Sequence, residues 1–130
     1  MTAAFLGWIL IFTGITPDET LAGYTAQGAT YVLSEIDGTP FDARASVSFP
    51  GEGRIVVRGP CNMFEARIGV PYPWFSLDPV RTTRRACPEL AQEAAFLAAL
   101  SDMTLAEVGP GLLLLSDDGT GHMIFVQSGE

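Results

Sequence analysis

The sequence has 130 residues, of which 48% are hydrophobic and 17% are charged, a composition typical of one globular domain with a single core. Fifteen acidic residues against seven arginines, with no lysine, give a net charge of -8, which argues against nucleic acid as a partner. The 14 glycines and 9 prolines are spread along the chain without a period, as in a fold with many turns.

The amino-terminal segment differs from the rest of the chain. Residues 3–15 are uncharged and mostly apolar, a length that matches the apolar region of a signal peptide and is too short to span a membrane. We therefore predict that residues 1–22 are a signal peptide cut after Ala22, and that residues 23–29 form a linker. Two acidic residues are unusual so close to such a cut, and no Lys or Arg precedes the apolar run. The alternative is a buried first strand or helix of the domain. The favoured interpretation is an exported protein of the periplasm or cell envelope, with no stable membrane span after cleavage.

Short segments in which apolar and polar residues alternate follow the linker, and this alternation is the pattern of half-buried β-strands. Turn sequences separate several of them, including the Pro-Gly-Glu-Gly of residues 50–53 and the Asp-Gly of residues 118–119. In chain order, the pattern predicts strands over residues 30–36, 45–49, 54–58, 63–68, 74–78, 103–108, 112–116 and 122–127.

One stretch lacks this alternation and predicts a helix. Residues 88–100 begin with a proline, which is tolerated in a first helical turn, and continue with strong helix formers. Leu90, Ala94, Leu97 and Leu100 recur at helical spacing, with Phe96 on the flank of the same face, so we expect this face to lie on the sheet. The predicted fold class is α+β, mostly β: a curled antiparallel sheet or partial barrel of about seven or eight strands with one helix packed on it.

The chain has two cysteines, Cys61 and Cys87. In an exported protein we expect them to form a disulfide, because oxidation is favoured outside the cytoplasm. The alternative is a redox or nucleophilic thiol, but the chain has no Cys-x-x-Cys motif, and neither cysteine has a base or cation beside it in the sequence. Two cysteines and the single histidine are too few ligands for a zinc site, so we expect no metal and no cofactor.

The two cysteines lie in segments that resemble a known family. Residues 59–64 read Gly-Pro-Cys-Asn-Met-Phe, and residues 82–89 read Thr-Thr-Arg-Arg-Ala-Cys-Pro-Glu, followed by the predicted helix. This order is similar to that of the META domain, the family of the bacterial heat-shock protein HslJ, and the resemblance covers about residues 30–127. It implies a compact β-rich domain of envelope or secreted proteins, associated with stress and drug tolerance, without a known reaction. It also implies structural roles for Cys61, Asn62, Thr83 and Cys87.

The catalytic candidates lack partners in the sequence. His122 is the only histidine, and no motif resembling a nucleophile elbow lies near it, so we expect no Ser-His-Asp or Cys-His site. The neighbouring carboxylates Asp117 and Asp118 are expected to be turn residues. We therefore predict that the chain is not an enzyme, a small hydrolase being the less favoured alternative.

The binding candidates fall into two groups. Residues 71–75, Pro-Tyr-Pro-Trp-Phe, contain Tyr72 and Trp74, which suit a partner surface or ligand groove, although aromatic rings here are more simply explained as filling the barrel. Arg81, Arg84 and Arg85 form a basic cluster that can bind a carboxylate or phosphate, or can pair with surface acids. The predicted function is a monomeric, non-enzymatic domain that binds an unidentified protein or small ligand. A protease-inhibitor-like module is the alternative.

Overall fold

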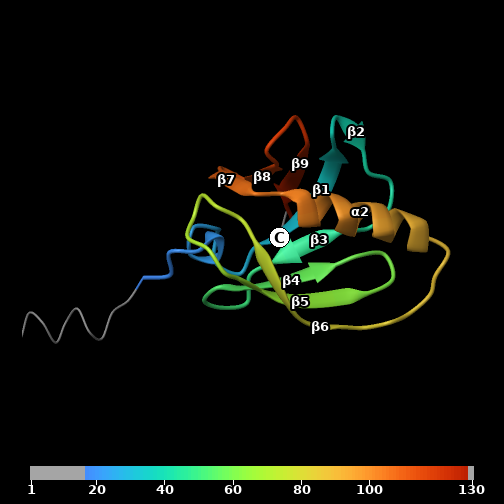
Figure 1. Cartoon of the computed structure of the whole chain (residues 1–130), viewed down its shortest axis with the longest axis horizontal. Coiled ribbons are helices and arrows are strands. Elements are labelled where there is room, and N and C mark those ends of the chain that lie inside the picture. The colour runs from blue at the N-terminus through green and yellow to red at the C-terminus, as the bar shows by residue number, and fades with distance from the viewer. Residues whose placement is uncertain (1–16, 129–130) are drawn as a thin grey trace, which may run out of the picture.

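The computed structural model describes residues 17–128, and most of the predicted signal peptide lies outside this range. Nine antiparallel strands form one curled sheet (Figure 1), in which eight follow the order β6-β5-β4-β3-β1-β9-β8-β7 and β2 pairs with β1. Within the described residues there is one α-helix, together with a short 3-10 helix, η1, and neither is long and apolar enough to cross a membrane. The predicted α+β class, a curled sheet with one helix, is therefore confirmed. The elements are η1 (Leu21–Gly23), β1 (Thr30–Ile36), β2 (Thr39–Pro40), β3 (Ser46–Ser48), β4 (Arg54–Arg58), β5 (Met63–Ile68), β6 (Leu77–Thr82), α2 (Leu90–Asp102), β7 (Leu105–Gly109), β8 (Leu112–Ser116) and β9 (His122–Gln127).

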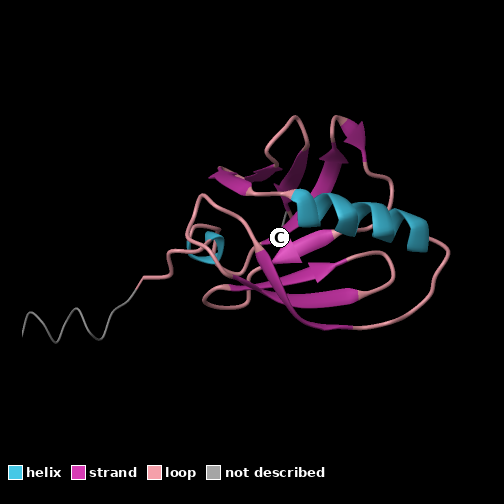
Figure 2. Cartoon of the chain, viewed as in Figure 1, coloured by secondary structure: helices cyan, strands magenta, loops and turns pink. Residues whose placement is uncertain are grey.

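Alternation along the strands gives the sheet one buried face. Tyr31 in β1, Val47 in β3, Val57 in β4, Leu113 in β8 and Phe125 in β9 are each at most 1% exposed. Because successive side chains of a strand point to opposite faces, these residues line the inside of the curl. Helix α2 lies across the sheet (Figure 2), so the core is enclosed between the helix and the sheet.

The helix differs from the prediction in the face that it buries. Its buried residues are Glu93, Phe96 and Leu100, whereas Leu90 is 44% exposed and Ala94 is exposed. The predicted stripe was therefore wrong at Leu90 and Ala94 but right at Phe96 and Leu100, and the predicted contact of the helix with the sheet is confirmed. The physical reason is that the Glu93 carboxylate accepts hydrogen bonds from Cys61 and Asn62 in the turn before β5, which fixes the rotation of the helix about its axis.

The predicted strand over residues 74–78 was also wrong in position, since β6 begins only at Leu77. The Phe75 amide donates to the Thr104 carbonyl oxygen at 2.8 Å, and the Ala106 amide donates to the Pro73 carbonyl oxygen at 2.7 Å. This part of the chain therefore pairs with the edge of β7 before it crosses to β5 and continues as β6. The alternating segment of residues 74–78 thus pairs with two different strands, first with β7 and then with β5.

Residues next to the predicted cleavage site pack into the domain. Leu21 in η1 is 0% exposed, and the Asp18 carboxylate accepts a hydrogen bond from the Gly53 amide at 3.0 Å. Burial raises the pKa of Asp18, but hydrogen bonds from the Thr20 hydroxyl and from the amides of Gly53 and Thr20 outweigh burial and hold this pKa below its usual value. A cut after Ala22 would remove this buried leucine and this hydrogen-bonded carboxylate.

Candidate functional site

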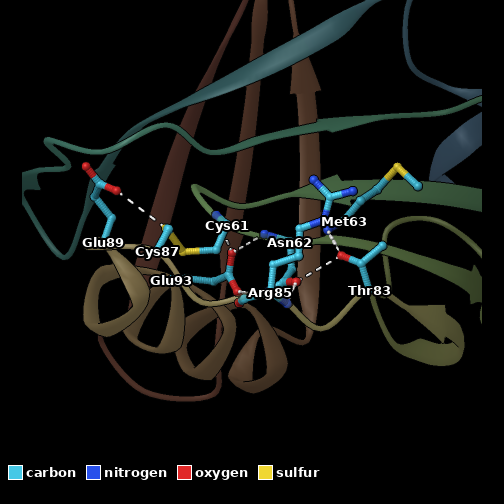
Figure 3. The surroundings of a disulfide bond; sticks show 8 residues. All are labelled: Cys61, Asn62, Met63, Thr83, Arg85, Cys87, Glu89 and Glu93. Atoms are coloured by element: carbon cyan, nitrogen blue, oxygen red, sulfur yellow. Dashed lines mark hydrogen bonds between the residues drawn. A yellow bond between two sulfur atoms is a disulfide. The ribbon is translucent and has the colours of Figure 1, made fainter.

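Cys61 and Cys87 form a disulfide, with 5.6 Å between their Cα atoms (Figure 3), which confirms the predicted pair. Cys61 lies in the turn before β5, and Cys87 lies just before α2. The bond therefore ties the amino-terminal end of the helix to the sheet.

The side chain of Asn62 joins the same two segments. Its Oδ1 accepts hydrogen bonds from the Thr83 hydroxyl at 2.9 Å and from the Arg85 amide at 2.6 Å, and its Nδ2 donates to the Arg85 carbonyl oxygen at 3.0 Å. The Thr83 Oγ1 in turn accepts a hydrogen bond from the Met63 amide at 3.0 Å. Asn62 and Thr83, two of the four residues for which the family resemblance implied structural roles, thus connect the start of β5 to the loop that leads into α2.

Glu93 completes this network from the helix (Figure 3). Its Oε1 accepts hydrogen bonds from the amides of Cys61 at 2.9 Å and Asn62 at 2.8 Å, and its Oε2 accepts one from Asn62 Nδ2 at 2.7 Å. The residue is 3% exposed. Burial raises the pKa of Glu93, but the hydrogen bonds from the Asn62 side chain and the two amides outweigh it, so the pKa lies below its usual value of 4.5. The carboxylate is therefore ionised at neutral pH and held by three donors.

Sequence reasoning missed Glu93, although two signals were available. The residue stands at helical spacing with Phe96 and Leu100, so it occupies a buried position of the helix. Gly59 in the opposite turn leaves no room for a side chain, because a Cβ atom there would overlap the Glu93 carboxylate. A glycine just before a Cys-Asn turn, together with an acid on the buried face of the next helix, is the pattern that points to this contact.

Tyr72 and Trp74 lie beside the edge of β7. The Tyr72 hydroxyl accepts a hydrogen bond from the Val108 amide at 3.0 Å, and its ring stacks on Tyr24 with centroids 4.3 Å apart. Trp74 forms an isolated bridge with Leu105, and its side chain is 55% exposed. Tyr72 thus satisfies an edge amide of β7 with its hydroxyl, while the indole of Trp74 stays accessible.

The three arginines of the predicted cluster lie on two different segments. The Arg81 guanidinium on β6 lies 2.9 Å from the Glu65 carboxylate and is 74% exposed. Arg84 and Arg85 follow in the loop before α2, and both are exposed. Of the two predicted groups, Tyr72 and Trp74 therefore border β7, whereas the arginines lie on β6 and in the loop before α2.

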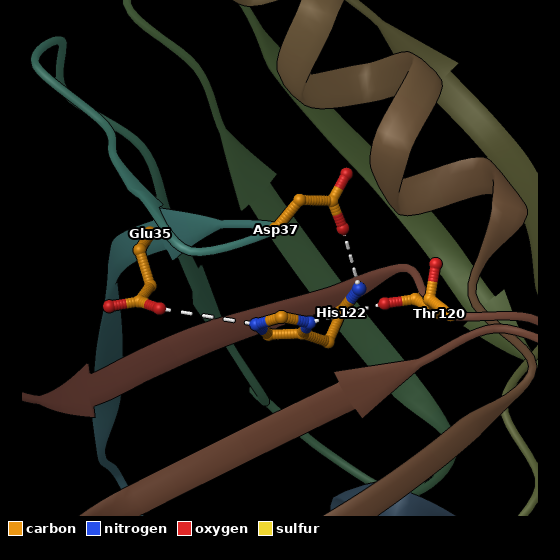
Figure 4. A network of polar contacts seen from close by, with 4 residues as sticks. All are labelled: Glu35, Asp37, Thr120 and His122. Carbon is orange, nitrogen blue, oxygen red and sulfur yellow. Dashed lines mark hydrogen bonds and ion pairs between the residues drawn. The ribbon is translucent and has the colours of Figure 1, made fainter.

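His122 has carboxylates nearby that the sequence did not indicate. Its Nε2 lies 4.0 Å from a Glu35 carboxylate oxygen, its Nδ1 lies 3.3 Å from the Thr120 carbonyl oxygen, and its backbone amide donates to Asp37 at 2.8 Å (Figure 4). These contacts join the turn between β1 and β2 to the start of β9. The neighbouring Asp117 accepts hydrogen bonds from the amides of Gly119 and Gly121 at 2.8 Å and 2.9 Å, as expected of a turn residue. Within residues 17–128, no group of three or more His, Cys, Asp and Glu residues is placed to hold a metal ion.

An apolar cavity of about 560 Å³ opens between β5, β6 and α2. Its walls include the side chains of Val57, Phe64, Phe75, Leu77, Leu97 and Leu100. Of the predicted binding residues, only Arg81 lines it. The sequence did not indicate this cavity, because its walls come from segments that are far apart along the chain.

These features define a class of protein: a small, disulfide-linked β half-barrel crossed by one helix, with an apolar cavity between the helix and an edge strand. The model of the META domain matches residues 24–130, so the chain belongs to the META domain family. Searches among curated proteins and among solved structures find no match.

Proposed function

We propose that this META domain binds a small apolar molecule, without chemical conversion, in the cavity between β5, β6 and α2. The observation that carries the proposal is the cavity itself. Its volume of about 560 Å³ lies within the range of roughly 300–1,000 Å³ that is typical of small-molecule sites. Apolar side chains from the sheet and the helix form most of its walls, and a few polar residues such as Ser101 and Thr104 line it as well.

The properties of β6 favour a small molecule over a peptide as the occupant. β6 is the last strand in the order of the sheet, so its outer edge faces the cavity and could pair with an added strand. Three features weaken such pairing: Pro79 lacks an amide hydrogen, the pairing with β5 shifts register between Glu65 and Ala66, and Arg81 adds charge. The side-chain lining of the cavity is better suited to a ligand that needs no backbone hydrogen bonds.

A matched pair of helix variants tests the proposal. Ser101 lines the cavity and Ala98 does not, although both are exposed positions of α2. We expect the wild-type chain to bind the neutral dye N-phenylnaphthylamine with a rise in fluorescence. Ser101→Trp should weaken this binding about tenfold or more by filling the cavity, and Ala98→Trp should leave it unchanged. Absence of dye binding to the wild type, or equal binding by both variants, would overturn the proposal, provided that urea denaturation shows both variants folded.

The proposal includes export to the periplasm or cell envelope, where the domain acts as a monomer under stress conditions. The disulfide and the apolar run of residues 3–15 support the export part, since disulfides persist in oxidising compartments. The association with stress comes from the family resemblance. Cell fractionation combined with thiol labelling tests the location: a cytoplasmic protein with two free thiols would overturn export.

A further inference from the structure

Arginine side chains gather on the outer face of the sheet, opposite the core. A groove of about 340 Å³ crosses β4, β5 and β6 there, and its charged lining residues are Arg54, Arg67 and Arg81 against the single acid Glu65. The chain as a whole carries a net charge of -8, so this local excess of positive charge runs against the overall balance. Three arginines against one acid give the groove a net positive charge, which attracts an anion.

Two of these arginines face each other without a partner. Arg54 on β4 and Arg67 on β5 are directly opposite in the register of the two strands, an arrangement that destabilises a sheet when both charges have the same sign. Among the described residues, neither forms an ion pair, and this includes Asp78, which stands opposite Arg67 on β6. The one ion pair in the groove joins Arg81 to Glu65 at 2.9 Å. A bound anion would offset the repulsion between Arg54 and Arg67.

The basic groove and the apolar cavity meet at β6. Both are lined by Glu65, Ala66, Val80 and Arg81. At this point the register shifts, so that Val80 stands between the two residues that pair with β5 and has no partner of its own, and its side chain is 56% exposed. Since β6 is an edge strand, a flexible molecule can pass from the cavity over this edge to the arginines outside.

From this arrangement we infer that the ligand is a single-chain anionic amphiphile. Its apolar chain lies in the cavity between β6 and α2, and its carboxylate or phosphate head group lies on Arg81 and on the Arg54–Arg67 pair. Guanidinium groups bind both kinds of head group through paired hydrogen bonds. This inference rests on the proposed function and adds the chemical class of the ligand to it.

The experiment compares ligands that share one chain and differ in head group. Decanoate, decyl phosphate, 1-decanol and decyltrimethylammonium compete with the neutral dye for the wild-type chain, for Arg54→Gln/Arg67→Gln and for the control Arg44→Gln. Arg44 is exposed and lines neither the cavity nor the groove. The alcohol is the more hydrophobic ligand, so a preference for the carboxylate has to come from recognition of charge.

We expect decanoate or decyl phosphate to displace the dye at about tenfold lower concentration than 1-decanol, with a preference that weakens as salt rises. The preference should disappear in Arg54→Gln/Arg67→Gln and persist in Arg44→Gln. Whichever of the two anions competes better identifies the head group. Equal competition by 1-decanol and both anions, or stronger competition by the cationic ligand, would overturn the inference. If Ser101→Trp still weakens dye binding in that case, the proposed function stands and only the inference about the head group is wrong. A wild-type chain that binds neither the dye nor any of the decyl ligands overturns both the proposed function and this inference.

Discussion

Replacing Glu93 by glutamine is expected to lower the free energy of unfolding by about 3 kcal/mol. The magnitude follows because each hydrogen bond to a charged group contributes about 1.5–3 kcal/mol. The carboxylate accepts three hydrogen bonds, two on Oε1 and one on Oε2. A glutamine amide keeps one acceptor oxygen, so its NH₂ group must face the Asn62 Nδ2 donor or the two backbone donors. Asn62 cannot turn its amide to compensate, because its Oδ1 already accepts from the Thr83 hydroxyl and the Arg85 amide. At least one bond is therefore lost, and the remaining bonds lose their charge assistance.

Urea denaturation at pH 7, with the disulfide intact, measures this loss. A reduction of about 3 kcal/mol is a large part of the ~5–15 kcal/mol that is typical of a domain, so the urea midpoint should fall clearly while the slope stays the same. Glu107→Gln is the matched control, since Glu107 is exposed on β7 and should give no measurable change. If the curves of Glu93→Gln and wild type coincide, the assignment of Glu93 as the carboxylate that holds the helix on the sheet is wrong.

Three further predictions concern pH, the amino-terminal segment and the disulfide. The pKa values of Glu93 and Asp18 lie below their usual values in the folded state, so the unfolded state binds more protons in the acidic range. The stabilisation from these two carboxylates should therefore be fully present above the usual carboxyl pKa and should be lost as the pH falls through their pKa values in the folded state. The urea midpoint should decline less with falling pH in Glu93→Gln than in the wild type, and an equal decline would contradict this. A chain that begins at residue 23 should be less stable than one that begins at residue 17 by about 2–5 kcal/mol, because the first lacks the fully buried Leu21; equal urea midpoints would show that this side chain adds nothing to the core. Reduction of the disulfide should lower the free energy of unfolding by about 3–4 kcal/mol, and an unchanged urea midpoint after treatment with dithiothreitol would refute this.

Much of the local structure could be predicted because short-range patterns encode it. The alternation in residues 54–58 places Ile55 and Val57 on one face, and both are 1% exposed in β4. The disulfide followed from an even count of two cysteines, and the motif around Cys61 and Cys87 indicated the family. In each of these cases the signal lies in residue types and spacings within one or two segments.

The candidate site was less predictable because its contacts join distant parts of the chain. Glu93 is 32 residues from Cys61, to whose amide it is hydrogen-bonded, and Tyr72 is 36 residues from Val108. Periodicity gives the spacing of a helix face, but it does not give the rotation of that face on the sheet. The rotation is set by a buried carboxylate that has three donors, so Glu93 is buried whereas Leu90 and Ala94 are exposed.

The sequence by itself determined the elements of this protein: the alternating strands, the helix, the cysteine pair and the META domain motif, all of which depend on backbone propensity and on which side chains avoid water. Only the tertiary structure decided which edge strand of the sheet is covered by another segment and which is left open. One edge, β7, is covered by the segment around Tyr72, while the other, β6, borders the apolar cavity on one side and the basic groove on the other. Which edge is covered depends on the free energy of long-range pairing, and that free energy is a property of the folded chain as a whole.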